Sequence, residues 1–391
     1  PNKAIDPGLT YDAGELDYLV ASCGTVTPLL TPGDCAFVEA IGFSTSPADL
    51  NLPSIGIGAL PGTQTVTRTV TAVGAPNTRA SGDRDAFFGG RGATPALPEA
   101  TRYRAVIDAP EGFEVSVSPS EIVLAAGESA SYALTVTNDT AIPNVWEFGS
   151  LTWEPESGNG VRSPIAVKAL AFITEDEVDG AGAQGSAQFD MTFGYSGDYT
   201  AQVHGLNSAT PVGFVNLLDD PDNSFAFSFS DPATFATIID DVQPGTAFRR
   251  FALYNEYTTG NDDIDLYLYY CPGGSCTQIA SSANAGSDEE VSVLLPIPFD
   301  EVAFNPYVLF IHAFETEAPD TTFIYFDSTF GIVDDAGNLS VDAPATATAG
   351  QTVPITVDWT DLPTGLLEKQ LGAISHSDPN GIQNLTIIDI E

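Results

Sequence analysis

Two short acidic segments carry the residues best suited to chemistry in this 391-residue chain. Each gathers carboxylates and an amide in a turn-like context, and Ca²⁺ takes about six to eight such hard oxygen ligands. Neither segment fits the EF-hand loop, because the Gly and the terminal Glu of that loop are missing. We expect no required cofactor, with Ca²⁺ as one hypothesis and solvated acidic turns as the other. The candidate ligands are Asp219, Asp220, Asp222, Asn223, Asn261, Asp262, Asp263 and Asp265.

Hydrolytic chemistry finds little support in the sequence. Only His204, His312 and His376 could act as imidazole bases, and none stands beside a plausible nucleophile. The G-x-S-x-G and H-E-x-x-H motifs are missing. Paired carboxylates could cleave glycosides, but among 53 acidic residues a pair in the sequence carries almost no information. We therefore expect no catalytic residue in this chain.

The charge balance excludes two classes of partner. Lys and Arg number 12 against 53 Asp and Glu, which gives a net charge of −41, concentrated after residue 172. Such a field repels phosphate backbones and anionic lipid headgroups, so we expect neither nucleic-acid nor membrane binding. A hydrophobic fraction of 43% still permits packed cores.

Four cysteines form two local pairs in the sequence. Four cysteines allow three connectivities, and proximity favours Cys23 with Cys35 and Cys271 with Cys276. The alternative, a four-sulfur zinc site, needs two C-x-x-C knuckles, and neither spacing fits well. Two disulfides imply an oxidising compartment, so we expect a secreted, extracellular protein.

Short alternating runs between Gly- and Pro-rich turns predict an all-β protein with several β-sandwich domains in tandem. Residues 61–173 are predicted as one sandwich, 188–333 as a second all-β unit and 334–391 as a short third one. Residues 174–187 are predicted as a linker, whose formal G-x-G-x-x-G lacks the following helix that would bind a pyrophosphate. The third unit repeats the first at an offset of 223, since Ala126-Gly127 recurs as Ala349-Gly350 and Gly149 as Gly372. In this repeat His376 takes the place of Trp153.

Several ordered motifs in the first 170 residues carry a family resemblance. They are residues 4–12 (AIDPGLTYD), 17–19 (DYL), 23–24 (CG), 49–55 (DLNLPSI), 67–74 (TRTVTAVG), 148–153 (FGSLTW) and 161–165 (VRSPI). This set resembles the region that follows the catalytic domain in subtilisin-like serine proteases of the cucumisin-like branch. The resemblance implies that residues 1–60 are the tail of a catalytic domain and a connector, and that 61–173 are a fibronectin type III-like sandwich. Leu52 and Ala72 depart from the family, which usually has Tyr and Asn there.

A shorter motif characterises the middle unit. Residues 263–269 (DIDLYLY) resemble a strand of bacterial pre-peptidase C-terminal domains, which are jelly-roll-like sandwiches appended to secreted peptidases. The resemblance implies a secreted bacterial subtilase, with the last unit as a short Ig- or fibronectin-like sandwich. Its catalytic domain, in the same precursor, is then the expected partner, together with a protein substrate.

Two functional hypotheses follow. In the first, the chain is the non-catalytic C-terminal region of a subtilisin-like serine endopeptidase. It would stabilise the catalytic domain and aid secretion, maturation or substrate docking. The family's Ser, His and Asp motifs are missing, so the chain is expected to begin downstream of the catalytic residues. In the second, the chain is an adhesin-like module that binds insoluble protein or polysaccharide through exposed aromatic residues, with Tyr267, Tyr269 and Tyr270 as candidates.

Overall fold

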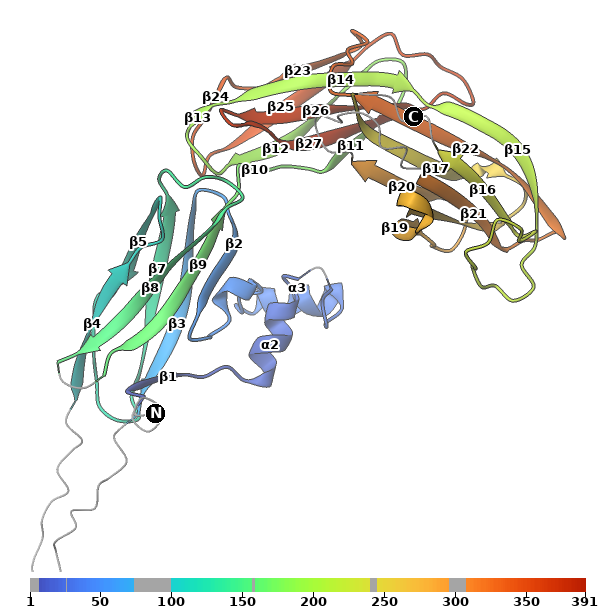
Figure 1. The fold of residues 1–391 in the computed structure, drawn as a ribbon. Helices are drawn as coiled ribbons and strands as arrows, with labels where there is room; N and C mark the ends of the chain where they lie inside the picture. The colour runs from blue at the N-terminus through green and yellow to red at the C-terminus, as the bar shows by residue number, and fades with distance from the viewer. Residues whose placement is uncertain (1–6, 26, 74–99, 157–158, 240–244, 295–306) are drawn as a thin grey trace, which may run out of the picture. The chain divides into compact units, whose positions relative to one another are not determined.

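A computed structural model describes residues 7–391, apart from residues 26, 74–99, 157–158, 240–244 and 295–306. The described residues form β-sheets with two short α-helices, so the all-β prediction is confirmed (Figure 1). The chain divides into two compact units. The first contains Pro1–Ile173 with Thr192–Gly197 and Thr346–Thr352, and the second contains the remainder.

The first unit holds a β-sandwich, here called the first sandwich. One sheet has the strand order β1-β3-β7-β5 and the other has β2-β9-β8-β4-β6. Strand β2 pairs with β9 in parallel, and the other registered pairs of the two sheets are antiparallel. The strands are β1 (Leu9–Tyr11), β2 (Ile55–Leu60), β3 (Thr63–Ala72), β4 (Thr101–Asp108), β5 (Phe113–Ser118), β6 (Glu121–Leu124), β7 (Ser129–Asn138), β8 (Trp146–Pro155) and β9 (Val161–Ala169).

Period-two alternation explains why these segments form strands with one buried face. On β3 the side chains of Val66, Arg68 and Val70 point inward, while the threonines between them face outward. Trp153 lies at the centre of the core, fully buried, and packs edge-on against Tyr132 with ring centroids 5.2 Å apart.

A short helical segment precedes the first sandwich. It consists of α2 (Glu15–Ser22), α3 (Pro32–Ala40) and the 3₁₀ turn η1 (Pro47–Asp49). Asp17 caps the start of α2 by accepting the Gly14 N–H at 2.7 Å, and Thr31 caps α3 by accepting the Asp34 N–H at 3.2 Å. Within the described ranges, no helix is long and apolar enough to cross a bilayer.

Another sandwich, here called the second sandwich, has the strand orders β10-β12-β25-β23 and β11-β27-β26-β14. Most of its residues belong to the second unit, whereas β10 and the last two residues of β12 belong to the first. As β2 does with β9, the edge strand β11 pairs in parallel with β27. Strands β25 and β26 begin 223 and 224 residues after β7 and β8, respectively. The strands are β10 (Phe172–Ile173), β11 (Glu177–Gly180), β12 (Gly185–Phe193), β14 (Thr200–Ser208), β23 (Leu339–Asp342), β25 (Thr352–Trp359), β26 (Gln370–Asp378) and β27 (Gly381–Ile390), with a separate ribbon of β13 (Gly197–Asp198) and β24 (Thr346–Ala347).

A third sandwich, here called the inserted sandwich, lies in the sequence between β14 and β23. Its sheets have the orders β15-β22-β17-β20 and β16-β21-β18-β19. Phe251, Leu266 and Phe323 are fully buried members of its core. Its strands are β15 (Thr210–Leu218), β16 (Thr234–Ile239), β17 (Thr246–Thr258), β18 (Asp263–Tyr270), β19 (Thr277–Ser282), β20 (Glu289–Leu294), β21 (Tyr307–Glu315) and β22 (Asp320–Gly331), with the turn η2 (Pro272–Gly274).

The sheet pairing differs from the division expected at residues 188–333 and 334–391. Strand β26 pairs with β14 and β27 pairs with β11, so residues 334–391 complete a sandwich that starts before residue 188. Residues 174–187, expected as a linker, contain β11 and the start of β12. Local alternation marks a strand but does not identify its partner, which explains why the interrupted sandwich looked short.

Candidate functional site

The helical segment exposes an unusual amount of apolar side chain. No residue of α3 is buried, and most of its apolar side chains face solvent. Clustered exposed hydrophobic residues of this kind mark interaction surfaces in soluble proteins. We call this set the helical surface; its members are Leu16, Tyr18, Leu29, Phe37, Ile41 and Phe43, with exposed fractions between 40% and 73%.

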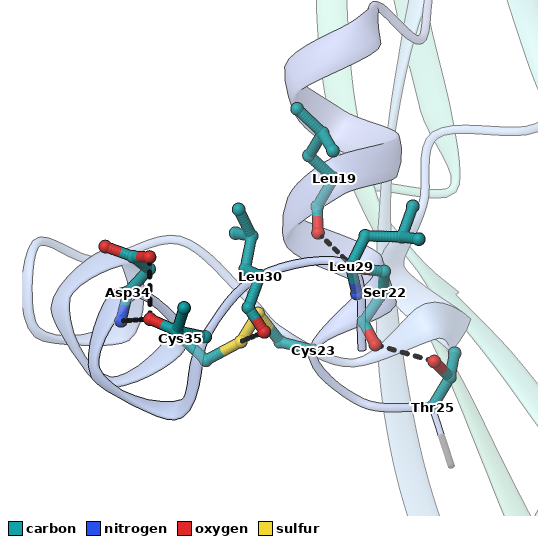
Figure 2. Close-up of a disulfide and its surroundings, with 9 residues drawn as sticks. Leu19, Ser22, Cys23, Thr25, Leu29, Leu30, Asp34 and Cys35 are labelled. Carbon is teal, nitrogen blue, oxygen red and sulfur yellow. Dashed lines mark hydrogen bonds between the residues drawn. A yellow bond between two sulfur atoms is a disulfide. The ribbon is translucent and has the colours of Figure 1, made fainter. Parts of the chain in front are cut away.

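A disulfide holds the two helices together in place of a core. Cys23, after the end of α2, bonds to Cys35 within α3, with the Cα atoms 5.7 Å apart (Figure 2). Ser22 adds to this brace, because its Oγ donates to the Leu19 carbonyl at 2.6 Å and accepts the Leu29 N–H at 3.0 Å. A helix as short as α3 is marginal on its own in water, so the cross-link compensates for the missing burial.

The chain between the helices and β3 is bound to the first sandwich by two polar side chains. Arg68, only 2% exposed, donates to the carbonyls of Leu52 and Ser54, each at 3.2 Å. Asn51 accepts the Thr69 N–H at 2.8 Å and donates to the Thr69 carbonyl at 2.9 Å. Burial lowers the pKa of Arg68, yet its carbonyl partners satisfy the guanidinium.

Strand β1 is anchored by a third contact. The Tyr11 hydroxyl lies 2.7 Å from Ser163 Oγ and 3.1 Å from the Tyr132 hydroxyl. Tyr11, Asn51, Arg68 and Ser163 all belong to the motifs that carry the family resemblance. Those motifs therefore fix the helical segment to the sandwich. The sequence motifs carried the resemblance, but this anchoring role of Arg68 was not predicted from them.

The first predicted calcium segment lies at one end of the inserted sandwich. Asp219 Oδ1 accepts the Thr316 N–H at 2.9 Å, and Asp220 accepts the N–H groups of Asp222 and Ser224. Asp222 and Asn223 are exposed in the turn itself. The carboxylates of this segment thus cap backbone groups instead of converging on one point.

The second predicted segment reaches the same β21–β22 turn. Asp262 Oδ1 accepts the Glu317 N–H at 2.8 Å, and Asn261 Nδ2 donates to Glu317 Oε1 at 2.8 Å. Asp265 accepts the Tyr267 hydroxyl at 2.9 Å. The structure therefore brings both predicted segments to one neighbourhood, and it adds Glu317, which sequence reasoning missed because it lies 55 residues from Asp262.

His312 links the two segments. It is fully buried, with Nε2 at 3.0 Å from Asp220 Oδ2 and Nδ1 at 3.7 Å from Asp265 Oδ2. Burial disfavours the imidazolium, but the two carboxylates outweigh this effect and raise the pKa of His312. Burial and the nearby negative charges of Asp265 and Glu315 raise the pKa of Asp263.

Two other histidines do contact hydroxyl groups, as a nucleophile–base pair would. His204 Nε2 lies 2.8 Å from Ser375 Oγ, and His376 lies 2.8 Å from the Tyr199 hydroxyl and 3.0 Å from Thr386 Oγ1. His204, Ser375 and His376 are fully buried inside the second sandwich. A substrate cannot reach them, so these pairs stabilise a core.

Two further sequence predictions concern the disulfides and the aromatic residues of the adhesion hypothesis. Both local disulfides, Cys23–Cys35 and Cys271–Cys276, are present. The aromatic residues proposed for adhesion, Tyr267, Tyr269 and Tyr270, are half-buried. Phe225 stacks on Tyr267 with ring centroids 3.8 Å apart, so this ring face is already covered.

Comparison with known proteins locates one domain type. Residues 49–167 match the model of a fibronectin type-III domain. Subtilisin-like protease SBT3.11 of Arabidopsis thaliana is 29% identical over 187 residues, which cover 45% of this chain and 21% of that protease. SBT3.9 of the same plant is 32% identical over 176 residues, covering 43% of this chain and 19% of that protein. This chain thus spans about a fifth of the length of these relatives.

Among solved structures, the secreted serine protease VesC from Vibrio cholerae aligns over 71% of this chain and 49% of its own, at 11% identity and a TM-score of 0.21. A score this low does not establish a common fold. The sequence matches are the informative ones, and they fall on the first unit. Residues 49–167 thus match a fibronectin type-III domain, and this part of the chain is homologous to the non-catalytic, fibronectin-like region of subtilisin-like proteases.

Proposed function

We propose that this chain is the non-catalytic C-terminal region of a secreted bacterial subtilisin-like serine endopeptidase, and that the helical surface packs on the catalytic domain of the same precursor. The observation that carries the proposal is the helical surface itself. Six exposed apolar side chains, three of them on the helices α2 and α3 and three on the chain beside these helices, come directly before the residues that match the fibronectin type-III model. Covering them would remove apolar area from water and stabilise both partners.

The anchoring contacts attach the helical surface to the first sandwich. Arg68, Asn51 and Tyr11 bind the connector and β1 to the sandwich, so a domain docked on the helices is coupled to a stable β scaffold. We assign the inserted sandwich as the pre-peptidase C-terminal-like module, serving secretion, maturation or docking of a protein substrate. The homology to proteases and the DIDLYLY strand support that assignment.

The test uses the longer precursor that includes a catalytic domain. The double variant Phe37→Ser/Ile41→Ser should shorten the half-life of its endopeptidase activity at elevated temperature by several-fold. The matched control is Ile142→Ser, which alters a residue 65% exposed on the same unit, and it should behave as the wild type. An unchanged half-life in the double variant would refute docking through this surface. Hydrolysis of casein by the chain alone would refute the non-catalytic assignment.

A further inference from the structure

Asp262 is a buried carboxylate with half of its bonding capacity unused. The residue is only 2% exposed, and Oδ1 accepts the Glu317 N–H at 2.8 Å. Oδ2 is buried and has no hydrogen-bond partner among the residues that the structure describes. Burying an unpaired carboxylate oxygen is costly, and such atoms are uncommon in folded proteins unless an ion or water satisfies them.

A second carboxylate lies beside Asp262, at a notch left by a glycine. Gly260 has a φ of +75°, and a Cβ at this position would lie 2.8 Å from Glu317 Oε2 and 3.4 Å from Asp262 Oδ1. The carboxylates of Asp262 and Glu317 therefore border the same small space. Two like charges at such a position repel one another unless a cation lies between or beside them.

The inserted sandwich has no basic side chain to spare for this charge. Arg249 and Arg250 are its only Lys or Arg residues in the sequence from 210 to 331. Arg249 pairs with Asp327 at 2.6 Å, and Arg250 pairs with Glu177 and Asp389 at 2.6 and 2.8 Å. The buried His312 is held by Asp220 and Asp265, so its charge is engaged there.

We propose that the corner formed by Gly260–Asp262 and Glu317 binds a calcium ion through Asp262 Oδ2 and the Glu317 carboxylate. The donors are all oxygen atoms on turns, which is the ligand type of Ca²⁺, whereas zinc and copper favour imidazole or thiolate. Of the eight candidates from the sequence, this assignment keeps Asp262 as the ligand. Asp265 is engaged elsewhere, since its Oδ2 accepts the Tyr267 hydroxyl at 2.9 Å and lies 3.7 Å from His312 Nδ1.

Calcium binding is measured on the full chain after removal of metal with EDTA. Titration calorimetry with CaCl₂ should give a binding isotherm, and the unfolding temperature should rise with Ca²⁺ concentration, because a ligand specific for the folded state stabilises it. Asp262→Asn keeps the acceptor for the Glu317 N–H but loses the charge, so this variant should show no Ca²⁺-dependent rise. Asp222→Asn, which alters an exposed carboxylate of the first acidic segment, is the matched control and should respond as the wild type.

Two further measurements separate a lost site from a damaged fold. Without Ca²⁺, Asp262→Asn should unfold at the same or a higher temperature than the wild type, because it removes an unpaired buried charge. Glu317→Gln alters an exposed side chain and should weaken Ca²⁺ binding about tenfold or more. Absence of Ca²⁺ binding by the wild type would overturn the proposal, and so would an unchanged affinity in either Asp262→Asn or Glu317→Gln.

Discussion

The first and second sandwiches share one strand arrangement but differ in continuity. In the first, β4 ends at Asp108 and β5 begins at Phe113, so a short turn joins them. In the second, the equivalent strands β14 and β23 end at Ser208 and begin at Leu339, and the inserted sandwich occupies the interval. A turn at the edge of a sandwich can thus accept a whole domain, since both ends of the insertion return to neighbouring strands.

The two cores also differ in chemistry at a matching position. Trp153 fills the first core and packs on Tyr132, whereas His376 takes the corresponding place in the second and bonds to Tyr199 and Thr386. Ion pairs follow the same contrast. Arg104 and Glu121 of the first sandwich meet at the surface, while in the second unit Glu177 and Asp389 pair with Arg250, whose side chain is only 4% exposed. At the matching core position, the second sandwich therefore has a hydrogen-bonded imidazole where the first has an indole packed on an aromatic ring.

The largest effect is expected from cutting the second sandwich at its interruption. Truncation after Asn338 removes β23, β25, β26 and β27, so β11 and β14 lose their partners and β12 keeps only the two-residue strand β10. These strands should unfold completely. Replacing residues 209–338 by a short Gly-Asn turn should leave the sandwich folded, because its strand pairs all survive. Hydrogen-exchange protection of the amides in β14 reports both results. Protection of β14 in the truncated chain would show that the sandwich is not one folding unit.

Removal of the central aromatic residue of the first sandwich should have the next largest effect. Trp153→Ala leaves a large cavity in a fully buried site and should lower the free energy of unfolding by about 3–5 kcal/mol. Trp146→Ala on the same strand is the control, since Trp146 is 45% exposed and should cost about 1 kcal/mol or less. Calorimetry of the first unit measures both. Equal losses would mean that Trp153 is not central to this core.

Arg250 tests the buried cluster of the second unit. Its side chain is 4% exposed and pairs with Glu177, Glu290 and Asp389, so Arg250→Met leaves three carboxylates without their cation. The expected loss is about 3–5 kcal/mol in the unfolding of the second unit. Adding Asp389→Asn should recover part of that loss by removing one of the repelling charges. A double variant as unstable as the single one would argue against like-charge repulsion as the cause.

The sequence predicted the first sandwich as one domain, but it predicted the second sandwich only in part. The repeat at an offset of 223 residues marked the turn before β25 at Ala349-Gly350 and a position of β26 at Gly372, and it matched His376 to Trp153. Strand β11 and the start of β12 were missed because residues 174–187 are charged and Gly- and Ala-rich, with no apolar alternation to mark them. The pairing of β14 with β26 could not be predicted, because a complete domain separates the two strands in sequence.

The sequence predicted which acidic residues are candidate ligands, but it did not predict which of them are buried or which residues lie beside them. The acidic segments stood out in the sequence, yet only the structure shows that Asp262 is buried with an unpartnered Oδ2, whereas Asp222 and Asn261 are exposed. Glu317 gave no signal, because one Glu in an acidic chain is unremarkable until the β21–β22 turn brings it to Asp262. The helical surface was missed because residues 1–60 were expected only as a domain tail and connector, and neither the helices nor the exposure of their apolar side chains was predicted.

The pH dependence of stability should distinguish the two cores. Burial lowers the pKa of His376 from its usual 6.5 to about 4, so the unfolded chain binds a proton there that the folded sandwich does not. This contribution is complete above pH 6.5 and is lost as the pH falls toward 4, an effect of about 3 kcal/mol. His376→Phe should remove that acid sensitivity from the unfolding of the second unit. The first sandwich, with Trp153 in this place, has no such group.

Asp389 must be considered in that measurement, because its contribution to stability changes with pH in the direction opposite to that of His376. Burial raises its pKa from 3.8 to about 6, so its contribution to stability falls as the pH rises between these values. The two effects partly cancel in the wild type, and the informative quantity is the difference between wild type and His376→Phe across pH 4–7. A difference that does not change with pH would contradict a neutral, buried His376.

The smallest effect is expected at the surface pair of the first sandwich. Arg104 and Glu121 lie 3.1 Å apart, but the Arg104 side chain is 69% exposed, so water and salt screen the pair. Arg104→Ala should change the free energy of unfolding by about 0.5 kcal/mol or less, and high salt should abolish even that difference. Calorimetry of the first unit at low and high salt measures it. A loss comparable with that of Arg250→Met would remove the contrast between surface and buried ion pairs, because exposure would then not determine their contribution to stability.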